Sequence, residues 1–514
     1  MIYDAKSILL NKRSEYKKLK EEKAGVKSNF IYSSLYQILI LILPLVTAPY
    51  ISRVIGVEGN GIYSYTSSVV QYFIIFSMLG LSNYGNRTIA KCRDDKEKLS
   101  KEFSSIYIMQ LCTSAIMIIM YILYITFFDN KYYIYSLIQL IYLISTCFDV
   151  TWFFYGMEKF KLTVTRNTIV RICTVILIFL FVKDSNGLVT YMLLMVLSSL
   201  IGQLLLIPFL RKEVKFVKPS IRDVTKHIKP NLILFIPVIA VSVYKMMDKI
   251  MLGNMADIKE VGYYEYAERI INIPLGIITA LGTVMLPRVS NLLAKGREKE
   301  VENYIEKSIE YMMFLAMPIC LGLIVVAPEL IPIYLGKEYQ MTGTIIQYLA
   351  VTIIFVSWAN VIRTQYLIPK EKDRVYIISV VTGAIVNFVI NIILIPQYQA
   401  IGAAIGTIFA EFLVMAIQTI AVSKELNIKK YLMYAIKSLI AAFIMSIVII
   451  GLEKIINNKY IVILLQILIG MVVYFALSYK FIKKYIYLIP GINKFIKKEK
   501  IKEQYHAKSS YRNY

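Results

Sequence analysis

The amino-acid sequence predicts an all-α polytopic membrane protein with fourteen transmembrane helices, and three observations carry that prediction. The 514 residues are 57% hydrophobic and have a mean hydropathy of +0.60, which is not expected of a soluble globular protein of this length. Apolar runs long enough to cross a hydrocarbon core of about 30 Å recur along the whole chain. Lysine and arginine gather in alternate loops between these runs, the pattern that sets orientation in membranes.

The apolar runs give the predicted spans in chain order. The first two flank a short turn that contains Gly56 and Gly61, and prolines break the pattern around spans nine and ten. An even number of spans puts both ends of the chain on one side of the membrane. We place the spans at residues 29–53, 62–86, 103–127, 132–156, 162–182, 188–210, 229–253, 262–287, 308–335, 341–368, 374–396, 400–423, 431–452 and 460–482.

Basic side chains determine the predicted orientation. Both tails, the loop after span two and the loop after span six are rich in lysine and arginine, whereas the intervening loops carry few. Because positively charged loops stay inside, we expect both termini in the cytoplasm. The net charge of +24 follows from this topology and does not indicate nucleic-acid binding. The lysine-rich N-terminal tail lacks the apolar core of a secretory signal peptide.

The residue inventory disfavours several classes of chemistry. The five cysteines are scattered without a CxxC pair, and the chain has two histidines, so we expect no metal site and no histidine-based triad. The predicted outer loops are too short for an extracellular catalytic domain. We find no GxxxxGKS/T loop for ATP phosphates. We therefore expect no catalytic residues, no cofactor and no enzyme activity.

An internal repeat relates the two halves of the chain. GIYSY at 61–65 matches GYYEY at 262–266, and Pro44 has a counterpart in Pro237. Chance similarity between apolar segments is the alternative, but polar residues match as well. Because the repeat unit has six spans, we expect two six-helix bundles related by a pseudo-two-fold axis along the membrane normal. A second echo aligns Tyr155, Lys159 and Lys161 with Tyr366, Lys370 and Lys372.

The repeat divides the chain into six predicted parts. They are a basic cytoplasmic N-terminal tail at 1–28, an N-terminal six-helix bundle at 29–210, a basic cytoplasmic linker at 211–228, a C-terminal six-helix bundle at 229–423, two accessory helices at 431–482 and a basic cytoplasmic tail at 483–514. The accessory helices are almost wholly apolar, so we expect them to face lipid.

Polar residues at membrane depth form a stripe in span eight. Glu265, Glu268, Arg269 and Asn272 fall on one helical face, and Glu265 is placed to pair with Arg269 one turn later. Each buried charge disfavours membrane insertion by at least about 2.5–3.5 kcal/mol, so lipid-facing placement of them all is implausible. The aligned positions of span two are Ser64, Ser67, Ser68 and Gln71, and further charges in other spans are Asp149, Arg166, Arg171, Lys245, Asp248, Lys249, Arg363 and Glu411.

Two interpretations of these charges remain. In one, they neutralise one another in internal pairs. In the other, they line a hydrated cavity whose cationic groups suit an anionic, polar substrate. Arginine fits phosphate because its planar fork donates two parallel hydrogen bonds.

Three sequence runs resemble a known family. They are LPLVTAPYISRVIGVEGNGIYSY at 43–65, LGLSNYGNRTIAK at 79–91 and DKIMLGNMADIKEVGYYEYAERI at 248–270. Together they are similar to the Wzx-type polysaccharide repeat-unit flippases of the multidrug/oligosaccharidyl-lipid/polysaccharide transporter superfamily. The resemblance covers about residues 29–480.

The resemblance implies a fold, a cargo and a location. The fold is two six-helix bundles around a V-shaped cavity, plus two C-terminal helices. The cargo is an undecaprenyl-pyrophosphate-linked oligosaccharide, moved to the outer leaflet of the bacterial plasma (inner) membrane for capsule, O-antigen or exopolysaccharide assembly. A polysaccharide polymerase is an implied partner. In the related lipid II flippases, cavity arginines in the early helices of each half bind the diphosphate, and Arg53 and Arg269 match them here.

We therefore predict a flippase that works by alternating access. Arg269 and Lys245 attract the diphosphate, the sugars occupy the hydrated cavity, and an ion gradient supplies the energy. The predicted substrate-binding residues are Arg53, Lys245, Arg269, Arg363, Gln71 and Asn272. The candidates for coupling to a monovalent cation or a proton are Asp149, Asp248, Glu268 and Glu411.

Two rival functions remain. A multidrug exporter of the same superfamily would share the fold but have an acidic, aromatic cavity for cationic drugs. A membrane glycosyltransferase or polymerase would need catalytic acids in a sizeable outer loop.

Overall fold

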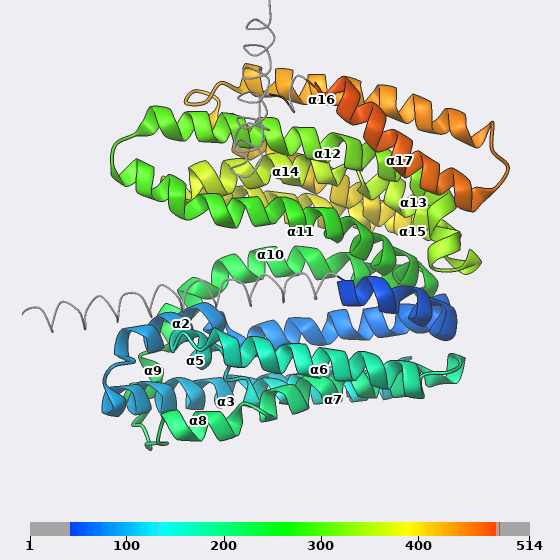
Figure 1. Ribbon diagram of the computed structural model, residues 1–514. Coiled ribbons are helices and arrows are strands. Elements are labelled where there is room, and N and C mark those ends of the chain that lie inside the picture. The colour runs from blue at the N-terminus through cyan, green and yellow to red at the C-terminus, as the bar shows by residue number, and fades with distance from the viewer. Residues whose placement is uncertain (1–41, 130, 480–482, 484–514) are drawn as a thin grey trace, which may run out of the picture. The chain divides into compact units, whose positions relative to one another are not determined.

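Helices make up the described part of the chain in the computed structural model, which describes residues 42–129, 131–479 and 483. Within these residues no strand occurs, which confirms the predicted all-α class (Figure 1). The predicted start of span one and both predicted cytoplasmic tails lie outside the described residues, apart from Lys483.

The helices of the first half follow one another through short connections. A helical run over residues 42–78 precedes the first labelled helix. The labelled elements are α2 (Leu81–Cys92), α3 (Lys96–Phe127), α4 (Tyr133–Ser145), η1 (Thr146–Phe148), α5 (Thr151–Gly156), α6 (Phe160–Phe181), η2 (Ser185–Gly187), α7 (Leu188–Leu204), α8 (Ile207–Glu213) and α9 (Ile221–Thr225).

The second half continues in the same way. Its elements are α10 (Ile228–Met255), α11 (Ile258–Ala294), α12 (Glu298–Tyr334), η3 (Lys337–Tyr339), α13 (Gln340–Leu349), α14 (Thr352–Ile362), the π-helical turn η4 (Arg363–Leu367), α15 (Asp373–Val422), α16 (Ile428–Glu453) and α17 (Lys459–Leu477).

Ten described helices are long and apolar enough to cross a membrane, or eleven when the bent pair Lys337–Leu349 and Thr352–Leu367 counts as one span. Two of them, Ile42–Cys92 and Asp373–Val422, have 51 and 50 residues. At 1.5 Å per residue each is about 75 Å long, far more than one crossing needs. Each contains a residue with positive φ, Gly56 at 73° and Gln399 at 51°. These helices are compatible with fourteen spans.

The described residues fall into two compact units. The first takes the chain up to Arg269, together with Pro332–Ile345 and Val380–Ala410. The second takes Ile270–Ile331, Ile346–Ser379 and the chain from Glu411 onward. The division into two six-helix bundles at the predicted boundaries stays a prediction.

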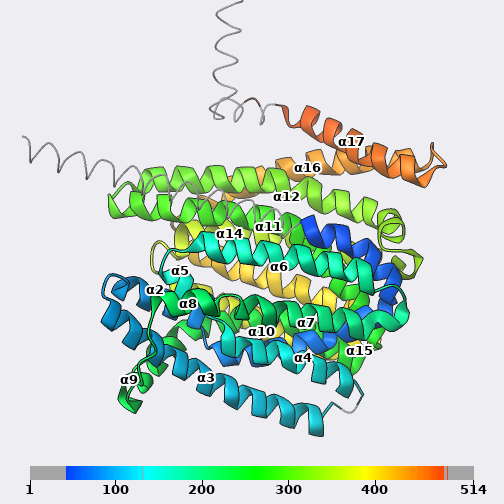
Figure 2. The ribbon, with the colours of Figure 1, turned by 60° about the horizontal axis from the view of Figure 1, so that its bottom comes forward.

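An aromatic core holds the first unit together near α2, α3 and α5. Trp152 and Phe153 are buried and pack against Phe103 of α3, and the Trp152 indole N–H donates to Gln110 at 3.0 Å. Gly85 of α2 lies against the indole so closely that an added Cβ would fall 2.5 Å from a ring carbon. Helices α4 and α7 pack side by side in the same unit (Figure 2).

The two copies of the glycine–tyrosine motif meet in the first unit. A Cβ on Gly61 would lie 2.1 Å from the carbonyl oxygen of Ile258, and a Cβ on Gly262 would lie 2.4 Å from that of Val57. The contacts are reciprocal, since each glycine faces the residue four positions before the other. Close backbone crossing at small residues is a common way for membrane helices to associate. The glycines of GIYSY and GYYEY therefore serve helix packing.

Two loops at matching positions of the two halves share a local structure that supports the internal repeat. In the first unit, Glu158 has φ of 57° and Lys159 pairs with Glu213 at 2.5 Å. In the second unit, Glu371 has φ of 55° and Lys372 pairs with Glu425. In both loops, a glutamate with left-handed backbone precedes a lysine that pairs with a more distant glutamate.

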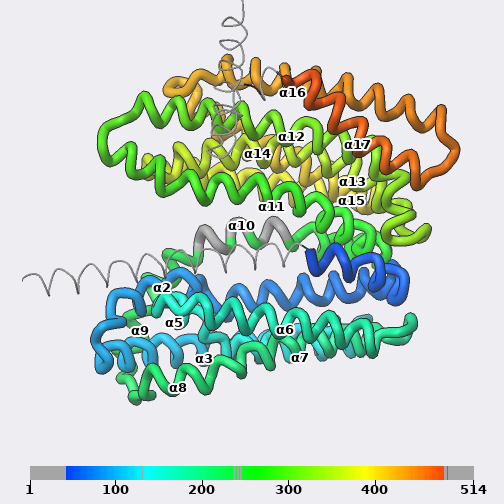
Figure 3. The backbone as a smooth tube through the Cα atoms, in the orientation of Figure 1, coloured from blue at the N-terminus to red at the C-terminus, as the bar shows by residue number. Residues whose placement is uncertain are grey.

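The last two described helices form a hairpin in the second unit (Figure 3). Gln466 of α17 donates to the Ile449 carbonyl of α16 at 3.1 Å and to Glu453 at 2.9 Å. Many of their remaining side chains are large, apolar and exposed, including Phe443 and Val472. Such surfaces suit lipid contact.

Candidate functional site

The charged stripe predicted in span eight forms a four-residue ionic cluster in the first unit. Lys249 of α10 lies between two carboxylates of α11, with its Nζ 2.9 Å from Glu265 Oε2 and 3.0 Å from Glu268 Oε2. Arg269 Nε donates to Glu265 Oε1 at 2.6 Å, the pair expected from their i,i+4 spacing. Two cations and two anions make this ionic cluster formally neutral.

The ionic cluster is sheltered without being fully closed. The Lys249 and Glu265 side chains are 15% and 14% exposed, Glu268 is 26% exposed and Arg269 is 37% exposed. The Ser64 hydroxyl donates to Glu265 Oε2 at 2.8 Å. Ser64 and Glu265 are aligned positions of the internal repeat, so the two copies of the stripe meet here.

Tyrosines surround the guanidinium end of the ionic cluster. Arg269 lies over the Tyr266 ring at 5.3 Å, and its guanidinium is within hydrogen-bonding reach of the Tyr191 hydroxyl. The Tyr63 and Tyr191 rings pack edge to face at 5.0 Å. Aromatic faces are suited to stacking, and the guanidinium retains N–H groups beyond the one given to Glu265. Tyr191 and Tyr266 are buried and Tyr63 is half-buried, so the rings enclose the guanidinium. The arrangement therefore offers donors for an anion in an aromatic setting.

A second polar site surrounds Asp248, which is 4% exposed. Its carboxylate accepts from the hydroxyls of Tyr264 and Thr407, both at 2.7 Å, and from the Asn391 amide at 2.6 Å. These three partners are neutral, so the carboxylate is buried among dipoles, an arrangement that is costly and marks functional sites in membranes. Lys249 is adjacent in sequence but belongs to the other network, because consecutive residues point about 100° apart on a helix.

The side-chain oxygen atoms around Asp248 differ in their hydrogen bonding. Asn391 Oδ1 is buried and has no hydrogen-bond partner among the residues that the structure describes. Gly406 leaves room for it, since a Cβ there would fall 2.2 Å from this oxygen. Asn387 also belongs to the network, through its Oδ1 at 3.3 Å from the Asn391 amide. We call Asp248, Tyr264, Asn387, Asn391 and Thr407 the Asp248 site.

Other predicted residues have structural partners. Arg53 donates to the carbonyls of Pro49 at 3.2 Å and Ile333 at 2.6 Å, so it satisfies a carbonyl in the last turn of α12. Asp149 accepts from the Thr151 amide at 2.9 Å at the start of α5. In the second unit, Arg363 donates to Asn360 at 2.7 Å. Their predicted roles in binding and coupling stay predictions.

The remaining predicted residues are placed as follows. Gln71 is half-buried in the first unit, and Asn272 is exposed in the second unit. Glu411 is half-buried in α15, at the residue where the chain returns to the second unit. The side chain of Lys245 lies outside the described residues. The sequence analysis missed Asn387, Asn391 and Thr407. Two asparagines one turn apart in the apolar span 374–396 were an available signal.

Comparison with known proteins identifies the families and relatives that this chain resembles. The polysaccharide biosynthesis protein family matches residues 26–293, and the MatE family matches residues 234–393. A protein named as an O-antigen transporter from Shigella dysenteriae is 26% identical over 73% of this chain and 94% of its own length. One of the same name from Escherichia coli is 23% identical over 77% of this chain and 96% of its own length.

A solved structure shares the fold. The lipid II flippase MurJ in an inward closed conformation superposes with a TM-score of 0.71 at 20% identity, over 89% of this chain and 99% of that one. The fold confirms a multi-pass membrane protein. The chain belongs to the polysaccharide biosynthesis protein family, the Wzx-type branch of the multidrug/oligosaccharidyl-lipid/polysaccharide transporter superfamily.

Proposed function

We propose that this protein is a flippase for undecaprenyl-pyrophosphate-linked oligosaccharide repeat units, which it moves from the inner to the outer leaflet by alternating access. The family and the flippases and O-antigen transporters similar to it support this proposal. The observation that carries it is the ionic cluster, which holds a partly exposed guanidinium beside tyrosine rings at membrane depth.

Arg269 is the proposed centre of diphosphate recognition. Its Nε is committed to Glu265 and another N–H faces the Tyr191 hydroxyl, so a phosphate oxygen would bind the remaining N–H groups or displace Tyr191. Gln71, Asn272, Lys245, Arg363 and Arg53 remain proposed contributors to substrate binding. The bacterial inner membrane, cytoplasmic termini and a downstream polymerase partner belong to the same proposal.

Deletion of the gene tests the function. We expect the lipid-linked repeat unit to accumulate on the inner leaflet, and the intact gene to restore its export. Arg269→Ala should abolish export while the protein still inserts, and Arg269→Lys should restore little because a lysine lacks the planar fork. Arg288→Ala is the matched control, because Arg288 lies on the same helix and contacts Tyr304 instead. Normal export by Arg269→Ala would show that Arg269 is structural.

The Asp248 site is the proposed coupling site for a monovalent cation. Its carboxylate, hydroxyl and amide oxygens are the ligand types that hard cations prefer, and the unpartnered Asn391 Oδ1 fits a ligand role. Sodium should raise the apparent melting temperature of the purified protein relative to choline. Asp248→Asn should lose that rise, whereas Asp184→Asn, which changes an exposed carboxylate that caps a short turn, should keep it. A response to pH without a response to sodium would assign proton coupling instead.

The alternative function is multidrug export, which the MatE match favours. Cells that express the protein should then tolerate cationic drugs, and Arg269→Ala should leave that tolerance intact. We expect no change in drug tolerance, because the ionic cluster is formally neutral and carries an arginine.

A further inference from the structure

The basic linker between α8 and α10 is held firmly against the end of α3. Two backbone amides of the linker donate to buried hydroxyls of α3, Lys215 N–H to Ser100 at 3.2 Å and Val217 N–H to Ser104 at 3.0 Å. The α9 turn begins with a capping box between Ser220 and Asp223. The linker therefore has a defined path on the first unit.

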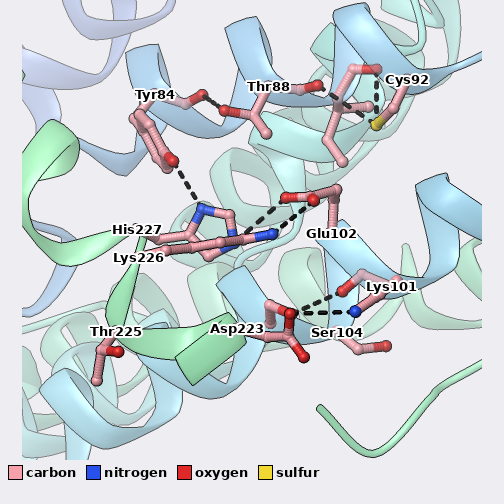
Figure 4. Close-up of polar contacts among 12 residues, drawn as sticks. Tyr84, Thr88, Cys92, Lys101, Glu102, Ser104, Asp223, Thr225, Lys226 and His227 are labelled. Carbon is pink, nitrogen blue, oxygen red and sulfur yellow. Dashed lines mark hydrogen bonds and ion pairs between the residues drawn. The ribbon is translucent and has the colours of Figure 1, made fainter. Parts of the chain in front are cut away.

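Ionic contacts hold α9 and the start of α10 to the same unit (Figure 4). Asp223 pairs with Lys101 at 3.1 Å, and Lys226 pairs with Glu102 at 2.7 Å. The buried His227 ring contacts the Tyr84 hydroxyl through Nδ1 at 2.6 Å. Residues 223, 226 and 227 thus form the inward face of this turn.

The opposite face combines exposed apolar and basic side chains. Ile221 is 84% exposed and Phe216 is 60% exposed. The basic side chains on this side are also exposed, and within the described part of the chain they form no ion pair. We call this surface the linker face; its residues are Lys215, Phe216, Lys218, Ile221, Arg222 and Lys229.

Helix α3 shows how deep the linker face lies. Its outer end at Phe127 is followed by the polar turn with Asp129, and its 32 residues span about 48 Å along the axis. Counting about 30 Å inward from Phe127 reaches Tyr107. Ser104, which binds the linker, lies one turn beyond that level. The linker face is therefore at the depth of the lipid headgroups.

A pocket adjoins the linker face at the start of α10. It has a volume of about 640 Å³ and is lined mainly by apolar side chains, including Ile228, Leu232 and Phe235, with Lys229 among them. Ile233 on the same lining is 59% exposed. An ammonium beside an apolar pocket at headgroup depth matches the two parts of a phospholipid, a phosphate and an acyl chain.

We propose that the linker face and this pocket bind an anionic phospholipid, with its phosphate on Lys218, Arg222 and Lys229 and an acyl chain along Ile228 and Leu232. Charge complementarity and depth identify the occupant. Positive loops also serve topology, but topology requires neither an exposed Ile221 nor a pocket. The leaflet rests on the proposed orientation, whereas the binding does not depend on flippase activity.

Native mass spectrometry of the purified, delipidated full-length protein tests the proposal. The protein is titrated with phosphatidylglycerol and, separately, with phosphatidylcholine, and bound lipids are counted. Each basic residue near an anionic surface strengthens attraction about fivefold. Lys218→Gln/Arg222→Gln/Lys229→Gln should therefore weaken phosphatidylglycerol retention at least tenfold. Ile221→Ser should weaken it without lowering the melting temperature, because that side chain is almost fully exposed.

The matched control removes three exposed lysines elsewhere, with Lys295→Gln/Lys299→Gln/Lys424→Gln. It makes the same charge change and should leave phosphatidylglycerol retention unchanged. Three outcomes would each overturn the proposal: the two triple variants lose phosphatidylglycerol equally, the natural sequence retains both lipids equally, or the triple variant at 218, 222 and 229 (the linker variant) retains phosphatidylglycerol fully. Competition by millimolar inorganic phosphate would indicate a free-anion site and overturn it too. Retention by the linker variant together with capture of an acidic protein would assign the face to a protein partner.

Discussion

The ionic cluster predicts a defined loss of stability when its central cation is removed. Lys249→Met leaves Glu268 without the ammonium 3.0 Å away, while Glu265 keeps Arg269 and Ser64. Removing one partner of a buried pair costs about 3–5 kcal/mol. Because the Glu268 side chain is 26% exposed, we expect the lower end of that range, about 3 kcal/mol. The apparent melting temperature should fall by several degrees.

A second substitution should recover most of this loss. Lys249→Met/Glu268→Gln removes one charge of each sign, so the cluster returns to neutrality around Glu265 and Arg269. We expect about 2 kcal/mol to be regained, because the unpaired carboxylate is gone. Thermal unfolding of the detergent-purified variants measures both effects. A double variant no more stable than Lys249→Met, or a single variant as stable as the natural sequence, would refute the pairing argument.

Two further predictions concern packing and pH. Gly61→Ala should lower the melting temperature or expression, because its Cβ would meet the Ile258 carbonyl oxygen at 2.1 Å. The control Gly451→Ala should be neutral or slightly stabilising, because no described atom lies within 4 Å of its Cβ. Equal effects of the two substitutions would contradict the close helix crossing at Gly61. Burial lowers the pKa of His227 from 6.5 to about 4, so the unfolded chain binds a proton first and stability should fall as pH drops from about 6.5 to about 4. His227→Gln should flatten that melting profile, and parallel profiles would argue against it.

Local sequence patterns predicted the features of this structure that depend on the geometry of a single helix. The i,i+4 spacing of Glu265 and Arg269 indicates a pair, and the pair is present at 2.6 Å. The repeated GIYSY and GYYEY runs predicted a symmetric relation, and their glycines meet reciprocally. Apolar run length predicted the helices, since crossing a bilayer requires a minimum length.

The sequence patterns did not predict which residues of distant segments contact each other. Lys249 and Asp248 are adjacent charges in span seven, yet they enter separate networks through partners on other helices. Arg53 matched an arginine of the family, but its observed partners are backbone carbonyls near the end of α12. Which carbonyl a long side chain reaches depends on tertiary packing, which spacing along one helix does not contain.

The neutrality of the ionic cluster affects how tightly Arg269 can bind an anion. A lone guanidinium at membrane depth would bind a diphosphate strongly and hold it, whereas transport needs release on the other side. In the proposed function, a phosphate would compete with Glu265 for the guanidinium, which Glu265 holds at 2.6 Å, and Lys249 would then neutralise the displaced Glu265 carboxylate. Binding then replaces Glu265 by a phosphate as the partner of Arg269, so the guanidinium gives up one ionic contact as it gains another. Such an exchange keeps the affinity moderate, which suits a carrier that has to unload its cargo.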